Sequence, residues 1–181
     1  MHRMTTLSGT AHFRQPALVV FSGLPGVGKT TIAKILCRKI RACYLRIDTV
    51  EQTLRCQMPD HPVTCQGYEV AYSIAQENLA LGCDVIADSI NPIELTRDAW
   101  RQVAVRSEAL CLEVEIICSH MPTHRQRVES RKADISGMTL PTWQKVIDRN
   151  YTPWHRPRLV IDTASSTAEE AAEQIRQNIR R

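Results

Sequence analysis

Eight consecutive residues have the types and spacing of a phosphate-binding loop. They fit the pattern G-x-x-x-x-G-K-[ST], in which glycines let backbone N–H groups turn inward around an anion. Lys29 would reach the β- and γ-phosphates of a nucleotide, and the Thr30 hydroxyl would hold Mg²⁺. An ordinary Gly/Pro turn is the alternative, but the full pattern favours a nucleotide site. The residues expected to bind ATP are Gly23, Leu24, Pro25, Gly26, Val27, Gly28, Lys29, Thr30 and Thr31.

Two aspartates follow predicted strands and should lie beside this loop. Asp48 ends the run Tyr44–Asp48, and Asp88 follows another apolar run. Because parallel strands end at one edge of a sheet, both carboxylates should converge on the same crevice. Asp48 suits a hydroxyl acceptor, since a carboxylate can orient a hydroxyl and accept its proton; a helix cap with capping-box spacing to Glu51 is the alternative. Asp88 is expected to organise Mg²⁺, with a cap or loop turn as its alternative.

A basic cluster follows later, at Arg125, Arg127, Arg131 and Lys132. The spacing of four predicts that Arg127 and Arg131 lie on one helix face, where two guanidiniums can clamp transferring phosphates. The Gly- and Pro-containing segment Ala133–Pro141 follows at once and breaks the helical pattern. We therefore expect a lid over about 125–141 that closes over ATP and excludes water, with a solvated charge run as the alternative.

The motifs of several other enzyme classes are absent from the sequence. No Asn-Lys-x-Asp string occurs, and Asp134–Gly137 matches the Asp-x-x-Gly of GTPases only within an irregular segment, so we attribute that match to chance. Asp88 has no neighbouring Glu to activate water, as a ring ATPase would have. His120 and His124 stand four apart, but Pro122 between them does not fit a zinc-protease helix, so both are predicted in loops or on the surface.

The elements that must position these side chains alternate between strand and helix patterns. Short apolar runs rich in β-branched residues predict strands buried in a parallel sheet. They are Ala17–Ser22, Cys43–Ile47, Cys83–Ala87, Leu112–Cys118 and Leu159–Ile161. Enough residues separate them for a helix each time, so the chain is predicted to adopt an α/β fold.

Helix signals occupy the intervening segments. An amphipathic stretch at Thr31–Ile40 follows the loop, and Asn91 with Pro92 predicts the start of a later helix. The side chains expected on the buried face of that helix are Trp100, Val103 and Ala104. Thr167 and Glu170 have the spacing of a capping box, which predicts the start of the last helix.

Composition limits the classes of protein that the chain can represent. Its 181 residues, 43% hydrophobic and 23% charged, suit one domain over 17–181 after a flexible leader at 1–16. A net charge of +4 is too small for an extended surface dedicated to nucleic-acid binding, so we expect a small-molecule partner and no nucleic acid. No apolar run approaches the roughly 20 residues of a membrane span. Seven scattered cysteines without Cys-x-x-Cys predict packed, reduced thiols and a cytoplasmic protein.

Four segments together resemble the small P-loop kinases of the adenylate-kinase-like superfamily. They are GLPGVGKTT at 23–31, LRIDTVE at 45–51, VIADSINP at 85–92 and RQRVESRKADISG at 125–137. The chain is most similar to the AAA-type predicted kinases grouped near polynucleotide kinase, chloramphenicol phosphotransferase and zeta toxin. This resemblance, which extends over nearly the whole chain, implies a three-layer P-loop NTPase fold. Its five-stranded parallel sheet would have the order 2-3-1-4-5, with a small helical lid.

The resemblance also implies roles for single residues. Asp48 corresponds to the carboxylate that activates the acceptor hydroxyl, and Arg127 and Arg131 correspond to lid arginines that act with Lys29. Polynucleotide kinases carry an Arg three residues after that Asp for the substrate phosphate, whereas this chain has Glu51. We therefore expect an ATP- and Mg²⁺-dependent kinase acting on a hydroxyl of a small molecule. A nucleic-acid 5′-hydroxyl kinase and a nucleotide-binding regulatory module without transfer activity are the alternatives.

Overall fold

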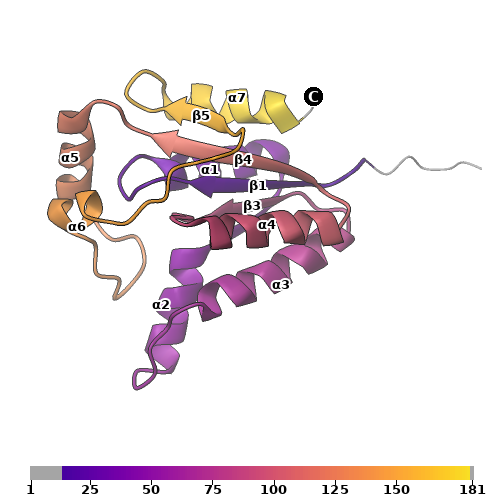
Figure 1. The fold of residues 1–181 in the computed structure, drawn as a ribbon, viewed down its shortest axis with the longest axis horizontal. Helices are drawn as coiled ribbons and strands as arrows, with labels where there is room; N and C mark the ends of the chain where they lie inside the picture. Colours follow the sequence, from indigo (N-terminus) through magenta and orange to yellow (C-terminus); the bar gives the residue numbers. More distant parts are fainter. Residues whose placement is uncertain (1–13, 180–181) are drawn as a thin grey trace, which may run out of the picture.

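A five-stranded parallel sheet with β1 at its centre organises the chain (Figure 1). The computed structural model describes residues 14–179. The strands are β1 (Ala17–Ser22), β2 (Cys43–Arg46), β3 (Val85–Asp88), β4 (Leu110–Ile117) and β5 (Leu159–Asp162). Their order is β2-β3-β1-β4-β5, which confirms the expected fold class and sheet order. Since all neighbours are parallel, the carboxyl ends of the strands share one edge.

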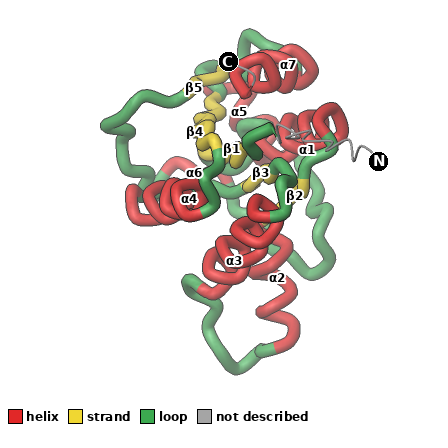
Figure 2. The backbone as a smooth tube through the Cα atoms, turned by 90° about the vertical axis from the view of Figure 1, so that its right-hand side faces the viewer, coloured by secondary structure: helices red, strands yellow, loops and turns green. Residues whose placement is uncertain are grey.

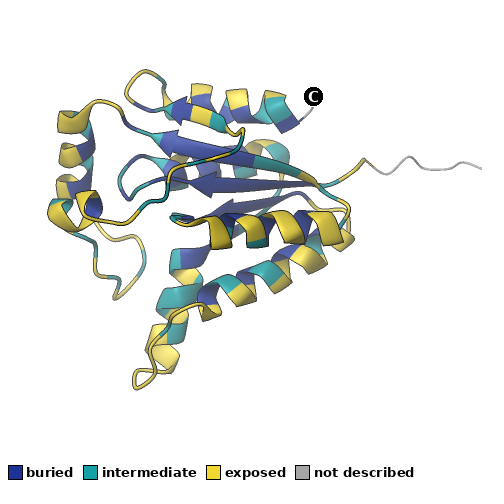
Figure 3. Cartoon of the chain, in the orientation of Figure 1, coloured by how far each residue is buried: buried dark blue, intermediate teal, exposed yellow. Residues whose placement is uncertain are grey.

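Helices cover both faces of this sheet, as Figure 2 shows. They are α1 (Lys29–Ile40), α2 (Ile47–Gln57), α3 (Gln66–Ala80), α4 (Glu94–Arg106), α5 (Met121–Ser130), α6 (Trp143–Ile147) and α7 (Ala168–Ile179). Val19 and Phe21 of β1 pack with α1 and α7, whereas Leu18 and Val20 pack with α3 and α4. Every residue of β1 is therefore buried (Figure 3), which explains its unbroken apolar sequence.

The two helix starts that the sequence marks have different outcomes. The predicted capping box of α7 is confirmed, because Thr167 N donates to Glu170 Oε2 at 2.8 Å and Glu170 N to Thr167 Oγ1 at 3.2 Å. The predicted start at Asn91 is wrong, since α4 begins at Glu94. Asn91 instead has φ +46, and its buried Nδ2 donates to Phe21 O at 2.8 Å. Its amide fastens the loop after β3 to β1, and the helix begins three residues later.

The return from α6 to β5 is an extended segment, residues 151–158, fixed by arginines. The buried guanidinium of Arg97 in α4 lies 5.0 Å from the Tyr151 ring centroid and 4.2 Å from that of Trp154, within range for cation–π attraction. It also donates to Thr152 O at 2.8 Å. The ion pairs that hold the rest of the segment to β4 are Arg156 with Glu113 and Arg158 with Glu115. This segment therefore has a fixed path on the sheet.

The cysteines are all free, but they are packed less uniformly than predicted. Cys118 is buried, whereas Cys56, Cys65 and Cys83 are exposed, so the prediction of packed thiols is wrong for these three. They lie at helix ends or in a turn, where the chain meets solvent whatever the apolar character of its neighbours.

The predicted flexible leader falls mostly outside the described residues, which begin at Arg14. Arg14 pairs with Asp84, and the Gln15 amide donates to Glu108 O at 2.7 Å. Within residues 14–179, no helix is both long and apolar enough to cross a membrane.

Candidate active site

The phosphate-binding loop connects the end of β1 to α1, and its conformation requires glycine. Gly23 has φ +130, and a Cβ at this position would overlap the carbonyl oxygen of Ile116. Gly28 has φ +101 and is the N-cap of α1. The first N–H groups of a helix lack intrahelical partners and carry the positive end of its dipole. This turn therefore presents backbone donors to an anion.

Lys29 begins α1 and is buried, with 8% of its surface exposed. Its Nζ donates to the carbonyl oxygens of Gly23 and Leu24 at 2.8 and 2.9 Å, so the side chain folds back along the loop. Burial lowers the pKa of Lys29 to about 8, although the nearby carboxylates of Asp88 and Asp48 oppose that shift. A buried ammonium whose partners are only neutral carbonyls favours an incoming anion.

A cavity of about 1240 Å³ opens beside this loop. The predicted site residues that line it are Pro25, Gly26, Gly28, Lys29, Thr30, Thr31, Asp48, Asp88, Arg127 and Arg131. Gly23, Leu24 and Val27 support the loop from behind and do not line the cavity. Most of the predicted residues are thus brought to one space, which is large enough for a nucleotide together with a second small molecule.

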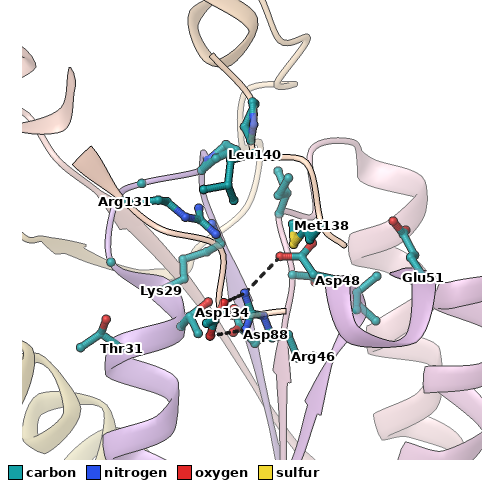
Figure 4. Close-up of a pocket in the computed structure, with 18 of the residues that line it drawn as sticks. Lys29, Thr31, Arg46, Asp48, Glu51, Asp88, Arg131, Asp134, Met138 and Leu140 are labelled. Atoms are coloured by element: carbon teal, nitrogen blue, oxygen red, sulfur yellow. Dashed lines mark hydrogen bonds and ion pairs between the residues drawn. The ribbon is translucent and has the colours of Figure 1, made fainter. Parts of the chain in front are cut away.

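Asp48 lies in the first turn of α2, because β2 already ends at Arg46. The N-cap of α2 is Arg46 and no side chain caps this helix, so the capping alternative for Asp48 is wrong. Asp48 Oδ2 lies 3.7 Å from an Arg46 guanidinium nitrogen, and about a third of the side chain (34%) is exposed. The carboxylate therefore keeps a free face toward the cavity (Figure 4).

Asp88 ends β3 and is almost fully buried, at 3% exposed. Its Oδ2 accepts a hydrogen bond of 2.7 Å from the Tyr44 hydroxyl, and burial together with this carboxylate raises the pKa of Tyr44. Tyr44 therefore stays a neutral donor that orients Asp88. Both Asp88 and Thr30 line the cavity.

The two arginines that we expected in a lid, Arg127 and Arg131, are not on one helix face, so that prediction is wrong. The helix α5 ends at Ser130, and Arg131 follows with extended backbone angles. Arg131 points toward Lys29 in Figure 4. Arg127 is instead bound to the loop after β5, donating to Thr163 Oγ1 at 2.8 Å and to Thr163 O at 3.1 Å. The two guanidiniums therefore contact different parts of the cavity wall.

Two groups at the site were missed or misplaced by sequence reasoning. Asp134 binds the buried guanidinium of Arg46 through both oxygens, at 2.8 and 3.0 Å. His124, predicted in a loop or on the surface, is buried in α5; its Nε2 lies 2.8 Å from Pro25 O, and its ring packs edge-on against Trp143. One histidine four positions before the buried Val128 gives too weak a periodic signal to reveal this contact, and no local pattern marks Asp134.

A phosphate-binding loop between the first strand and first helix of a parallel sheet of this order defines a P-loop NTPase-like α/β fold. Within that class, the chain belongs to the AAA_33 family of AAA domains, whose model matches residues 18–153. No curated protein sequence matches the chain significantly.

Several solved structures, two of them kinases, have the same fold. The APS kinase of Mycobacterium tuberculosis, solved with AMPPNP and APS, has a TM-score of 0.71 and 21% identity over 92% of this chain and 99% of its own. A gluconokinase of Sinorhizobium meliloti has a TM-score of 0.62 and 17% identity over 92% and 93%. The tunicamycin resistance protein of Deinococcus radiodurans has a TM-score of 0.63 and 17% identity over 92% and 96%.

Proposed function

We propose that the chain is an ATP- and Mg²⁺-dependent kinase that transfers the γ-phosphate of ATP to a hydroxyl of a small molecule. The observation that carries this proposal is the free carboxylate of Asp48 in the cavity that also holds Lys29. The two kinases of similar fold support it, since one of them was solved with AMPPNP and APS. The seven free thiols suit a reducing compartment, and we propose the cytoplasm.

The phosphates would be held by the loop and by two cations. Backbone N–H groups at the start of α1 donate to phosphate oxygens, and Lys29 exchanges its two carbonyl partners for the β- and γ-phosphates. Arg131, which points toward Lys29, would contact the transferring phosphate from the lid side. Arg127 would act nearer the loop after β5, where Thr163 fixes its guanidinium.

The residues present fit Mg²⁺, because Thr30 and Asp88 offer the oxygen donors that this ion prefers and both line the cavity. Tyr44 orients Asp88 and leaves its second oxygen available. When bound, Mg²⁺ would neutralise charge on the phosphates.

Asp48 would act as the general base. The acceptor hydroxyl donates to the free carboxylate oxygen, its oxygen attacks the γ-phosphorus, and its proton passes to Asp48 as the bond to the bridging oxygen of ADP breaks. Glu51, on the same helix, pairs with Arg55 at 2.7 Å, so neither of these adds a free charge for a substrate phosphate. This pair is consistent with a small, uncharged or weakly basic alcohol as the acceptor, whereas Lys132, Lys145 and Arg149 also line the cavity.

The test is a screen for ADP release with alcohol-bearing metabolites, antibiotics and oligonucleotides, followed by phosphorus NMR of the product. The Asp48→Asn variant should keep its affinity for ATP and lose turnover by about 10²–10⁴-fold. Asp60→Asn, at an exposed residue between α2 and α3, is the matched control and should turn over normally. Full turnover by Asp48→Asn would remove Asp48 as the base.

The same screen separates the two alternatives. Phosphorylation of oligonucleotide 5′-hydroxyls, with binding that weakens steeply with salt, would replace the small-molecule acceptor by nucleic acid. Tight ATP binding with no product from any acceptor, and an inert Asp48→Asn change, would indicate a regulatory module.

A further inference from the structure

A buried arginine between two carboxylates links the lid to the candidate base. Arg46, at the end of β2, has only 5% of its side chain exposed. Its Nη1 and Nη2 donate to the two oxygens of Asp134 at 2.8 and 3.0 Å, whereas Asp48 Oδ2 lies 3.7 Å away, beyond hydrogen-bond distance. Asp134 belongs to residues 131–142, between α5 and α6, here called the lid loop. The guanidinium of Arg46 is thus hydrogen-bonded to Asp134 in the lid loop and lies near Asp48 in α2.

The guanidinium must keep a carboxylate partner, because a buried charge left unpaired is strongly unfavourable and arginine does not lose its proton. Asp48 is the second carboxylate within 4 Å of it. If Asp134 moved away with the lid loop, Arg46 would therefore attract Asp48. A carboxylate bound by both arms of a guanidinium has fewer lone pairs left for an acceptor hydroxyl.

The other cation near Asp48 does not compete in this way. Lys29 lies close enough to feel the charge of Asp48, but its Nζ donates to two loop carbonyls and would turn to phosphates. The partner of Arg46 is therefore the variable that decides how strongly Asp48 is held.

Asp134 is well suited to bind Arg46 only when the lid loop lies on the core. It is also bound by Lys34 of α1 at 3.0 Å, and the Arg46 guanidinium beside it holds the pKa of the Asp134 carboxyl well below its usual range. The loop returns to α2 at Gly137, where a Cβ would lie 3.1 Å from Gln52 Nε2. Two cations from two core elements thus hold one lid carboxylate, and Figure 4 shows one of them, Arg46, beside Asp134.

We propose that Asp134 and Arg46 are positioning residues. When the lid loop is closed, Asp134 binds the guanidinium of Arg46, and Asp48 is therefore left free to face the acceptor. Lid closure then assembles the base as well as excluding water. This inference rests on the proposed kinase function for its catalytic consequence, but the competition of two carboxylates for Arg46 is a structural statement that is tested separately.

The structural test is a crystal structure of the full chain carrying Asp134→Asn. An amide has one acceptor oxygen and places N–H groups against the guanidinium, so it cannot replace both bonds. We expect the contact between Arg46 and Asp48 to shorten from 3.7 Å to hydrogen-bond distance. An unchanged separation, with Arg46 still bound by the lid loop, would overturn the proposal whatever the chain catalyses.

The kinetic test uses ADP release, with the acceptor found by the screen or, failing that, with water as the acceptor. Asp134→Asn should lower kcat by about tenfold or more and leave the KM for ATP within about twofold, since a misplaced base affects the reacting geometry. In the Asp48→Asn background the same change should have less than about a twofold effect, because the group it positions is gone. Equal losses in both backgrounds would indicate a purely structural lid contact and overturn the proposal.

The matched control is Asp148→Asn, at an exposed carboxylate just after α6 that binds the Gln144 amide outside the cavity. It makes the same chemical change on the lid side and should leave kcat and KM unchanged. If the unmodified chain forms no phosphorylated product, the proposed function fails, and the Arg46 distances in the Asp134→Asn crystal still decide the positioning proposal.

Discussion

The buried ammonium of Lys29 should take up a proton when ATP binds. Its pKa is lowered from 10.5 to about 8 by burial. At about 1.4 kcal/mol per pH unit, this difference corresponds to about 3 kcal/mol by which the empty site disfavours the charged lysine. Phosphate oxygens beside Nζ favour the charged form and should restore the pKa toward its ordinary value. Between pH 8 and 10 the complex therefore holds more protons than the free protein, so affinity must fall as pH rises.

Isothermal titration calorimetry with metal-free ATP, in pairs of buffers that differ in ionisation enthalpy, measures this uptake directly. With a free pKa of about 8, uptake should be about 0.1 proton per ATP at pH 7 and about 0.9 at pH 9. The affinity should approach a tenfold loss per pH unit above pH 8. At pH 9 the nucleotide contributes little, since phosphate groups titrate near 6, so the measurement at pH 9 is the decisive one.

The Lys29→Met variant is the control, because it keeps the length of the side chain without a titrating group. It should bind ATP more weakly and show no uptake at pH 9. Uptake near zero at pH 9 in the unmodified chain, or equal uptake in the variant, would refute the account of Lys29 as a desolvated phosphate ligand.

Two further variants test the loop and the core. Gly26 has φ +85, and Gly26→Ala should weaken ATP binding at least tenfold because the new Cβ would overlap the Val128 side chain. The control is Gly82→Ala, since Gly82 has a similar φ of +83 but a Cβ there would have no atom within 4 Å. This variant should bind ATP normally in the same titration. Trp100→Ala should lower the free energy of unfolding in urea by about 3–5 kcal/mol, because the indole is fully buried. A loss as small as that of Leu95→Ala, an exposed position on the same helix and expected within about 0.5 kcal/mol, would contradict the assigned core.

The features that the sequence predicts correctly are those determined by residues close to one another in the chain. The bounds of β1, the glycine-rich turn and the capping box at Thr167 depend on residues within eight positions of one another. The convergence of Asp48 and Asp88 needed one general rule, that parallel strands end at a common edge. For these features the neighbouring residues and the fold class contain enough information.

The features that were missed depend on single contacts between distant residues. Asp134 binds Arg46 across 88 positions, and His124 meets Pro25 across 99. A contact made by one side chain with one distant buried group produces no repeating pattern in the sequence from which it could be predicted. Asn91 shows the converse, since this residue has a good local cap signal but lies in a loop with φ +46 and donates to Phe21 O. The local preference of a residue for a helix cap can be overridden when its side chain forms a hydrogen bond with a buried polar group elsewhere in the fold.

These distant contacts also limit which part of the proposed lid, residues 125–141, could move. His124 and Val128 of α5 pack on the phosphate-binding loop, at Pro25 and Gly26, and Arg127 is bound to Thr163. Swinging α5 outward would expose the buried His124 and break these bonds, whereas the lid loop after Ser130 is tied to the core mainly through Asp134. We therefore infer that α5 supports the nucleotide site as a fixed wall. Opening for substrate exchange would be confined to residues 131–142, so that Asp134 is the contact broken first.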